Sequence, residues 1–166
     1  MGGGRRDPAA LSLRRVVYAD SSALVGLVAP GQELQPVYKA VLQDLVKRYQ
    51  VQLLTTNWVQ YESLTTLRSH GIEYCRRLQR LLEGGLFSVE PVSAELEDRT
   101  VEIFWTHQDK DWSIVDCSGI ALMENRQILY AFAADHHFRQ AGRIPLLEQT
   151  VDGRWQKAYS YLNFGW

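Results

Sequence analysis

Short apolar runs alternate with amphipathic segments along this chain of 166 residues, and this alternation limits the folds available to it. The first run, 16–19, is bounded by Asp20 and is typical of a buried strand that leads into a helix. Further strands are expected at 51–55, 86–89, 128–133 and 144–147. Between them, apolar residues recur about every four positions, as on one face of a helix. Because parallel strands need crossover connections that helices supply, we expect an α/β fold with three layers, α/β/α, around a mostly parallel central sheet.

Helices are predicted from capping residues, Pro, Gly and apolar repeats. They cover 22–28, a segment from Pro36 to Tyr49, 57–67 with Asn57 as its cap, 72–82, and segments that begin at Ser93 and at Ser113. The aromatic-rich stretch 155–166 fits either an added helix or an interface, and its periodicity does not choose between them.

The composition suits one globular domain, since 46% of the residues are hydrophobic and 22% are charged. We expect a flexible tail at 1–13, a folded domain at 14–147 and an aromatic C-terminal extension at 148–166. No apolar run approaches the ~20 residues that span a bilayer, and the start lacks the apolar core of a secretory signal. A cytoplasmic location without a membrane partner is therefore expected. Cys75 and Cys117 lack a paired spacing, so both are expected to be reduced core residues.

Four acidic residues fall where parallel α/β sheets place their sites, at the carboxyl ends of strands and the first turns of the following helices. They are Asp20, Glu62, Asp116 and Asp135. An acid at such a junction commonly only caps its helix or interacts with the helix dipole. Capping does not explain why Asp20 and Asp116 are flanked by apolar sequence, where an unpaired carboxylate is costly to bury.

Carboxylates that share one crevice repel one another unless a hard divalent cation takes up their charge. An all-oxygen set suits Mg²⁺ or Mn²⁺, and four acids are compatible with one ion or with two. Such ions activate water and stabilise the charge that builds on a phosphate during in-line displacement. The formal charge changes from −1 to +3 if these four acids are neutralised, which permits a nucleic-acid substrate.

The run 17–24, VYADSSAL, is similar to the opening motif of PIN domains, in which a strand ends in Asp and is followed by a small hydroxyl residue and an apolar helix. Three more segments follow in the expected order: 55–67 around Glu62, 109–117 around Asp116, and 133–138 around Asp135 with Gly142 beyond. Together these segments make the chain resemble the PIN-domain ribonucleases over 14–147.

The resemblance implies a PIN-like fold and a Mg²⁺- or Mn²⁺-dependent endoribonuclease, often the toxin of a VapBC-type toxin–antitoxin pair. It assigns Asp20, Glu62, Asp116 and Asp135 to the catalytic and metal-binding site. Ser113, one helical turn before Asp116, is similar to a hydroxyl residue that assists such sites, and simple helix capping explains it equally well. RNA is then the substrate, and a small antitoxin protein and a second copy of this chain are the expected partners.

Several other residues have a plain structural explanation beside a functional one. Four arginines form either a track for phosphates or a solvated basic face: Arg68, Arg76, Arg77 and Arg80. Two aromatic residues beside Glu62 either stack on bases or pack in the core: Trp58 and Tyr61. The acids Asp109 and Asp111 fit a solvated loop better than a ligand set, and the tandem His136 and His137 fit surface positions.

Two different functions compete with the nuclease hypothesis. A phosphotransfer enzyme with Asp20 as nucleophile would place a second Asp where this chain has Ser22, and it would leave Glu62 and Asp116 unexplained. A non-catalytic α/β module that binds RNA or a protein is not excluded by the residues, and it predicts indifference to chelators. Among nucleases, phosphate chemistry alone does not distinguish RNA from DNA.

Overall fold

The computed structural model describes residues 15–134 and 136–165. At its centre is a five-stranded sheet in the order β3-β2-β1-β4-β5. The strands are β1 (Val16–Ala19), β2 (Gln52–Thr56), β3 (Phe87–Glu90), β4 (Tyr130–Phe132) and β5 (Ile144–Pro145). Neighbouring strands are parallel throughout this sheet, so their carboxyl ends lie at one edge. The predicted parallel sheet is confirmed.

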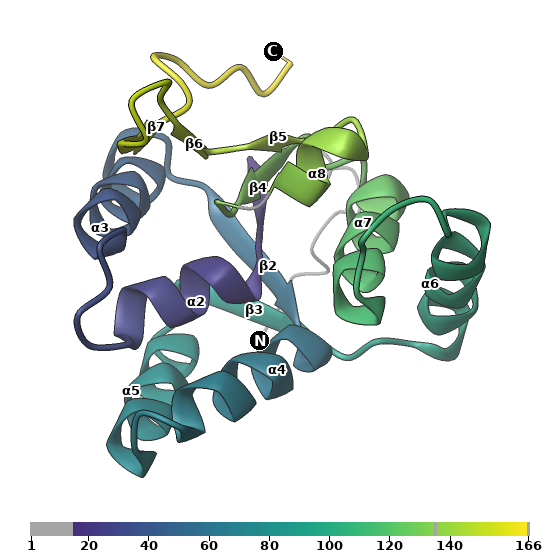
Figure 1. Cartoon of the computed structure of the whole chain (residues 1–166), viewed down its shortest axis with the longest axis horizontal. Helices are drawn as coiled ribbons and strands as arrows, with labels where there is room; N and C mark the ends of the chain where they lie inside the picture. The colour runs from purple at the N-terminus through teal and green to yellow at the C-terminus, as the bar shows by residue number, and fades with distance from the viewer. Residues whose placement is uncertain (1–14, 135, 166) are drawn as a thin grey trace, which may run out of the picture.

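Helices cover both faces of the sheet and complete three layers (Figure 1). They are α2 (Ser21–Val28), α3 (Gln35–Gln43), α4 (Asn57–Arg68), α5 (Ile72–Glu83), α6 (Ala94–Thr106), α7 (Ile114–Arg126), α8 (His136–Gln140) and the π-helical turn η1 (Asp44–Arg48). The group α2, α3, α4 and α5 packs together on one side, and α6 packs against α7 on the other. The predicted α/β/α fold is confirmed.

Strand β1 lies in the middle of the sheet, and its residues 17–19 are fully buried. The Tyr18 side chain reaches α7, where a Cβ added to Gly119 would lie only 2.4 Å from the tyrosine oxygen. Glycine at position 119 therefore allows α7 to approach the sheet closely. This approach brings the first turn of α7, which carries Asp116, toward the end of β1. Cys117 in the same turn is buried and free, as is Cys75, in agreement with the expectation that both are core residues.

Helix α4 is capped one residue earlier than predicted. Thr56 has an extended backbone, and its Oγ1 accepts a hydrogen bond from the Val59 N–H at 3.3 Å. Asn57 is the first helical residue, and its Oδ1 instead accepts a hydrogen bond from the Val92 N–H at 2.9 Å. The predicted cap at Asn57 was wrong because two adjacent residues both have capping side chains, and the backbone conformation selects between them.

The C-terminal part of the described chain forms a hairpin. β6 (Leu147–Gln149) pairs antiparallel with β7 (Trp155–Lys157), so the predicted strand at 144–147 is divided between β5 and β6. A helix at 155–166 is thereby wrong for the described residues. Beyond β7 the chain packs back on the domain, where Leu162 is 1% exposed. None of the described helices combines the length and apolar character that a bilayer span requires.

Candidate acidic site

The carboxyl edge of the sheet brings three of the four predicted acids near one another. Asp20 directly follows β1, Glu62 lies on α4 after β2, and Asp116 lies in the first turn of α7. The charges of Asp116 and Glu62 both raise the pKa of Asp20, so the three carboxylates lie near enough to repel one another. We call the part of the carboxyl edge between them the acidic crevice. The fourth predicted acid, Asp135, lies outside the described residues.

Asp20 is the most deeply buried of the three described acids, with 2% of its surface exposed. It caps α2, and its Oδ2 accepts hydrogen bonds from Ser22, from the Oγ at 3.1 Å and from the backbone N–H at 3.4 Å. Its Oδ1 is buried and has no hydrogen-bond partner among the described residues. Burial, followed by repulsion from Asp116, raises the pKa of Asp20 to about 7, although the backbone N–H groups of Ser21 and Ser22 oppose the shift.

Asp116 is held by the start of its own helix. Its Oδ2 accepts a hydrogen bond from the Ser113 N–H at 2.9 Å, and the Ser113 Oγ accepts one from the Asp116 N–H at 3.0 Å. This reciprocal pair is a capping box, so Ser113 acts as the helix cap. One carboxylate oxygen of Asp116 is thereby committed to the backbone, and the other remains for the crevice.

His137, which we expected at the surface from the sequence, lies against Asp116 in the structure. Its Nδ1 lies 3.2 Å from Asp116 Oδ2, and the side chains of His137 and Asp116 are only 15% and 13% exposed. The expectation of two surface histidines is therefore wrong for His137, whereas His136 is exposed. The signal in the sequence was its position two residues after Asp135. Only the packing of α8 shows which of two adjacent histidines turns inward.

Burial and the nearby carboxylates raise the pKa of two side chains beside the crevice, Tyr18 and Cys117. Burial, and then repulsion from Asp20 and the other two carboxylates, raises the pKa of Tyr18 well above its usual range. Burial and Asp116 raise the pKa of the Cys117 thiol to about 11. Cys117 is therefore a protonated thiol at neutral pH, which makes it unsuited to nucleophilic attack.

The donor chemistry of the crevice fits a hard divalent cation. Asp20, Glu62 and Asp116 offer carboxylate oxygens, and the buried Oδ1 of Asp20 lacks any other described partner. Within the described part of the chain, no three or more His, Cys, Asp or Glu side chains lie close enough together to hold a metal ion by themselves. The fit rests on the oxygen donors and on the unsatisfied Oδ1.

The remaining candidates flank the crevice or lie away from it. The four arginines of the suggested phosphate track are exposed and make no ion pair with a described residue, and Arg77 lies over the Tyr74 ring at 4.9 Å. Tyr61 is 58% exposed, whereas Trp58 is half-buried. Asp109 and Asp111 are exposed, as a solvated loop predicts.

Comparison with known proteins tests the resemblance directly. No protein-family model matches the chain. The 23S rRNA-specific endonuclease VapC20 of Mycobacterium tuberculosis, known from strains CDC 1551 and H37Rv, is 30% identical over 93 residues, which are 55% of this chain and 71% of the relative.

A solved structure of the same relative agrees with the sequence match. The crystal structure of Mycobacterium tuberculosis VapC20, described as a Sarcin-Ricin loop cleaving toxin, superimposes with a TM-score of 0.70 at 26% sequence identity. The superposition covers 77% of this chain and 96% of that structure, so almost the whole relative has a counterpart here. The chain therefore belongs to the VapC-like family of PIN-domain toxin endonucleases.

Proposed function

We propose that this chain is a divalent-metal-dependent endoribonuclease, the toxin of a toxin–antitoxin pair, and that Asp20, Glu62, Asp116 and Asp135 form its site. Family membership supports the ribonuclease activity, because the relative VapC20 is a 23S rRNA-specific endonuclease. The Sarcin-Ricin loop that VapC20 cleaves is accordingly the first RNA to test.

The observation that carries the metal dependence is the state of Asp20. A carboxylate that is 2% exposed, with one oxygen unsatisfied by described residues and two acids nearby, is unfavourable in a fold that has no further use for it. A cation in the crevice removes both the repulsion and the unsatisfied oxygen. Mg²⁺ or Mn²⁺ is the natural choice for oxygen donors, and when bound it supplies positive charge that stabilises the charge building on the scissile phosphate.

The residues of this chain set the geometry for that chemistry. Ser22 and the first turn of α2 orient Asp20 through its Oδ2, which leaves Oδ1 directed away from the cap. The capping box does the same for Asp116, so we assign Ser113 to positioning that carboxylate. Glu62, on the second turn of α4, adds the third carboxylate from the neighbouring strand connection.

Cleavage of RNA with and without metal tests this function. End-labelled Sarcin-Ricin loop RNA, a single-stranded RNA and a single-stranded DNA are incubated with wild type, Asp20→Asn and Asp116→Asn in Mg²⁺, Mn²⁺ or EDTA. Asp109→Asn is the matched control, since Asp109 lies close to Asp116 in sequence but is exposed in a loop. The proposal expects metal-dependent RNA cleavage by wild type and the control only. Cleavage that persists in EDTA, or in Asp20→Asn, contradicts it.

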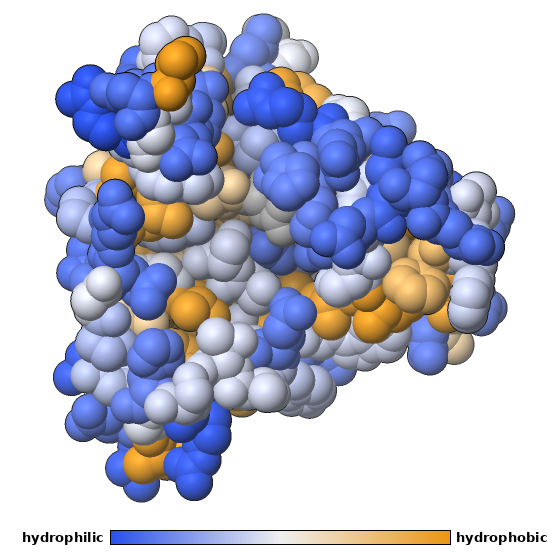
Figure 2. Space-filling model, viewed as in Figure 1, coloured by the Kyte–Doolittle hydropathy of each residue, from blue (hydrophilic) through white to orange (hydrophobic). Residues whose placement is uncertain are grey.

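We also propose an antitoxin and a homodimer as partners. Apolar surface is visible in the region of α6 and α7 (Figure 2). Exposed apolar side chains on these helices include Val101, Trp105 and Ile114, at 40%, 63% and 37% exposure. Mass measurement of the purified chain in solution tests the homodimer, and co-expression with the product of an adjacent small open reading frame tests the antitoxin.

A further inference from the structure

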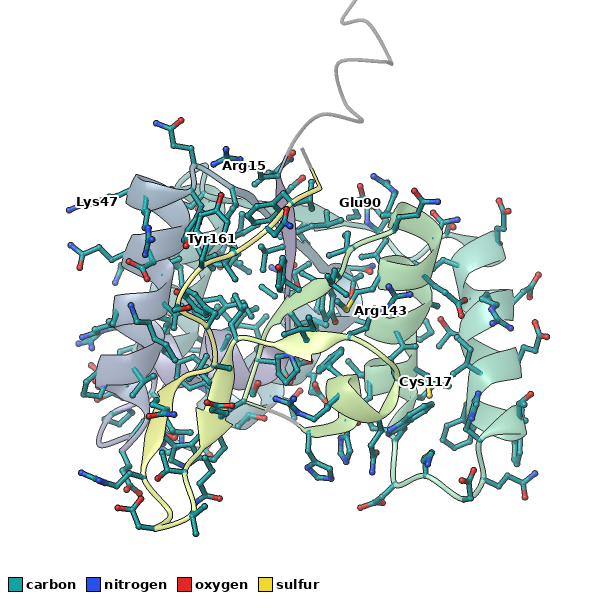
Figure 3. All side chains as sticks on the ribbon, turned by 90° about the horizontal axis from the view of Figure 1, so that it is seen from above. Arg15, Lys47, Glu90, Cys117, Arg143 and Tyr161 are labelled. Carbon is teal, nitrogen blue, oxygen red and sulfur yellow. The ribbon has the colours of Figure 1, made fainter. Side chains whose placement is uncertain are left out.

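Two arginines and an exposed tyrosine gather at the end of the sheet opposite the acidic crevice. Arg15 precedes β1 and Asp20 follows it, so about 17 Å of strand separates the two residues at ~3.3 Å per residue. Figure 3 shows Arg15 and Tyr161 toward one side of the molecule and Cys117, the neighbour of Asp116, toward the other. We propose that this region, which we call the aromatic notch, is a second contact site for single-stranded RNA. The identity of the nucleic acid rests on the proposed function.

The aromatic notch is a cavity of about 160 Å³. Arg15, Arg48, Tyr49 and the segment 161–164 line it, and no described carboxylate does so. Pockets that enclose whole small molecules are larger, at roughly 300–1,000 Å³. The notch is therefore suited to one group of a longer ligand, such as a phosphate or a base.

Two guanidinium groups, those of Arg15 and Arg48, bring positive charge to the notch. Arg48 is exposed and makes no ion pair with a described residue, and its guanidinium lies over the Tyr49 ring, 5.0 Å from the centroid. Arg15 lies over the Phe164 ring at 5.8 Å, and its Nη1 donates a hydrogen bond to the Tyr49 carbonyl at 3.0 Å. Asp44, the acid that Arg48 influences, is already paired with a lysine of β7 at 2.8 Å.

The rings of the notch leave an aromatic surface open. Tyr161 is 70% exposed, although its ring meets that of Tyr49 at a centroid distance of 6.2 Å. Tyr49 itself is 3% exposed and also meets Phe164 at 6.2 Å, so a buried ring supports the exposed one. An open ring beside a guanidinium is the combination by which proteins hold single strands, because a base stacks on the ring while the cation meets a phosphate.

Other ligands use these features less completely. A duplex keeps its bases stacked inside, so it would meet only the charge. A stable protein interface buries about 800 Å² on each partner, far more than a small notch provides. Single-stranded RNA uses the charge, the ring and the small volume together.

Direct binding of RNA tests the notch without requiring cleavage. Fluorescein-labelled single-stranded RNA is titrated with protein in EDTA and followed by fluorescence anisotropy. The test variant is Arg48→Gln/Tyr161→Ser, which replaces two exposed side chains of the notch. The matched control is Arg154→Gln/Val151→Ser, which removes an exposed arginine and an exposed apolar side chain from the turn between β6 and β7. We expect the test variant to bind about tenfold more weakly, with a salt slope shallower by about 0.7, and the control to match wild type.

The outcomes separate the notch from the nuclease. Equal affinity of wild type and the test variant overturns the proposal, as does the absence of RNA binding by wild type. A dimer that dissociates in the test variant also overturns it, because the notch would then be a protein interface. Thermal melting shows that the variants fold, and Tyr161→Phe, which keeps the ring, is expected to bind as wild type does. Cleavage of the same RNA in Mg²⁺ or Mn²⁺ reports separately on the proposed function.

Discussion

Asp20 is buried and Asp44 is partly buried, yet the groups around the two carboxylates have opposite effects on them. Asp44 accepts hydrogen bonds from Lys157 Nζ at 2.8 Å and Tyr159 OH at 2.9 Å, and the Lys157 hydrogen bond is the main reason that its pKa is lowered. Asp20 has acids for neighbours, an unsatisfied oxygen and a raised pKa. The first carboxylate stabilises the attachment of the C-terminal segment. The second costs stability, which is common at functional sites.

The largest difference between the acidic crevice and the Asp44 contact is expected in the rate of RNA cleavage. Glu62→Gln and Asp116→Asn should each lower RNA cleavage more than about 100-fold, because they remove carboxylates from the proposed site. Asp44→Asn should change the rate less than about twofold, since Asp44 lies in the C-terminal attachment. Single-turnover cleavage of labelled RNA measures both. A comparable loss of cleavage rate in Asp44→Asn would contradict this expectation.

Divalent ions should stabilise the fold through the acidic crevice and not through Asp44. At an ion concentration about 100 times the Kd, binding to the folded state adds about 2.7 kcal/mol to the free energy of unfolding. We expect Mn²⁺ to raise the melting temperature of wild type and of Asp44→Asn by similar amounts, and that of Asp20→Asn by no more than about half as much. Differential scanning calorimetry with and without EDTA provides the readout, and a shift of equal size in Asp20→Asn counts against the site.

In EDTA, Asp20→Asn is expected to be more stable than wild type at pH 8, by about 2 kcal/mol. The folded pKa of Asp20, about 7, lies above its ordinary value of 3.8. Its contribution to stability is therefore fully present below the ordinary value and is lost as the pH rises through about 7. As the pH rises through this range, urea unfolding should show a falling free energy of unfolding for wild type. Asp20→Asn should not show that fall. A variant less stable than wild type at pH 8 would show that Asp20 is a structural cap.

The smallest effect on the free energy of unfolding is expected for Asp44→Asn. The contribution of Asp44 depends on pH in the direction opposite to that of Asp20. Its pKa is lowered from 3.8, so its contribution is present above that value and is lost as the pH falls through the folded pKa. Asp44→Asn should lower the free energy of unfolding by about 1 kcal/mol at pH 7, because the pair is partly exposed. The difference from wild type should disappear in acid. Urea unfolding at two pH values measures this difference, with Asp111→Asn as a control at an exposed position.

The positions of Asp20 and Asp116 in the fold can be predicted from the residues next to them in the sequence. An apolar run that ends in Asp20, and Asp116 three residues after Ser113, are enough to place both acids at strand and helix ends. The parallel sheet follows because helices separate the strands, and its carboxyl edge then collects the acids. These features need no knowledge of distant packing.

The rest depends on tertiary contacts that no local pattern specifies. The inward turn of His137 depends on how α8 packs, and the pairing of Trp155 with Gln149 depends on a hairpin of two three-residue strands. The partners of Asp44 lie 113 and 115 residues away in sequence. The unsatisfied Oδ1 of Asp20 is a property of the assembled crevice and is visible only in the structure.

Binding of Mn²⁺ in solution tests whether the acidic crevice holds a cation. Electron paramagnetic resonance of free Mn²⁺ is followed as it is titrated with wild type, Asp20→Asn and Asp109→Asn. We expect wild type and Asp109→Asn to remove Mn²⁺ from solution with similar affinity, and Asp20→Asn to bind it more than about tenfold more weakly. Equal binding by all three proteins would contradict the account, because the ion would then be held elsewhere.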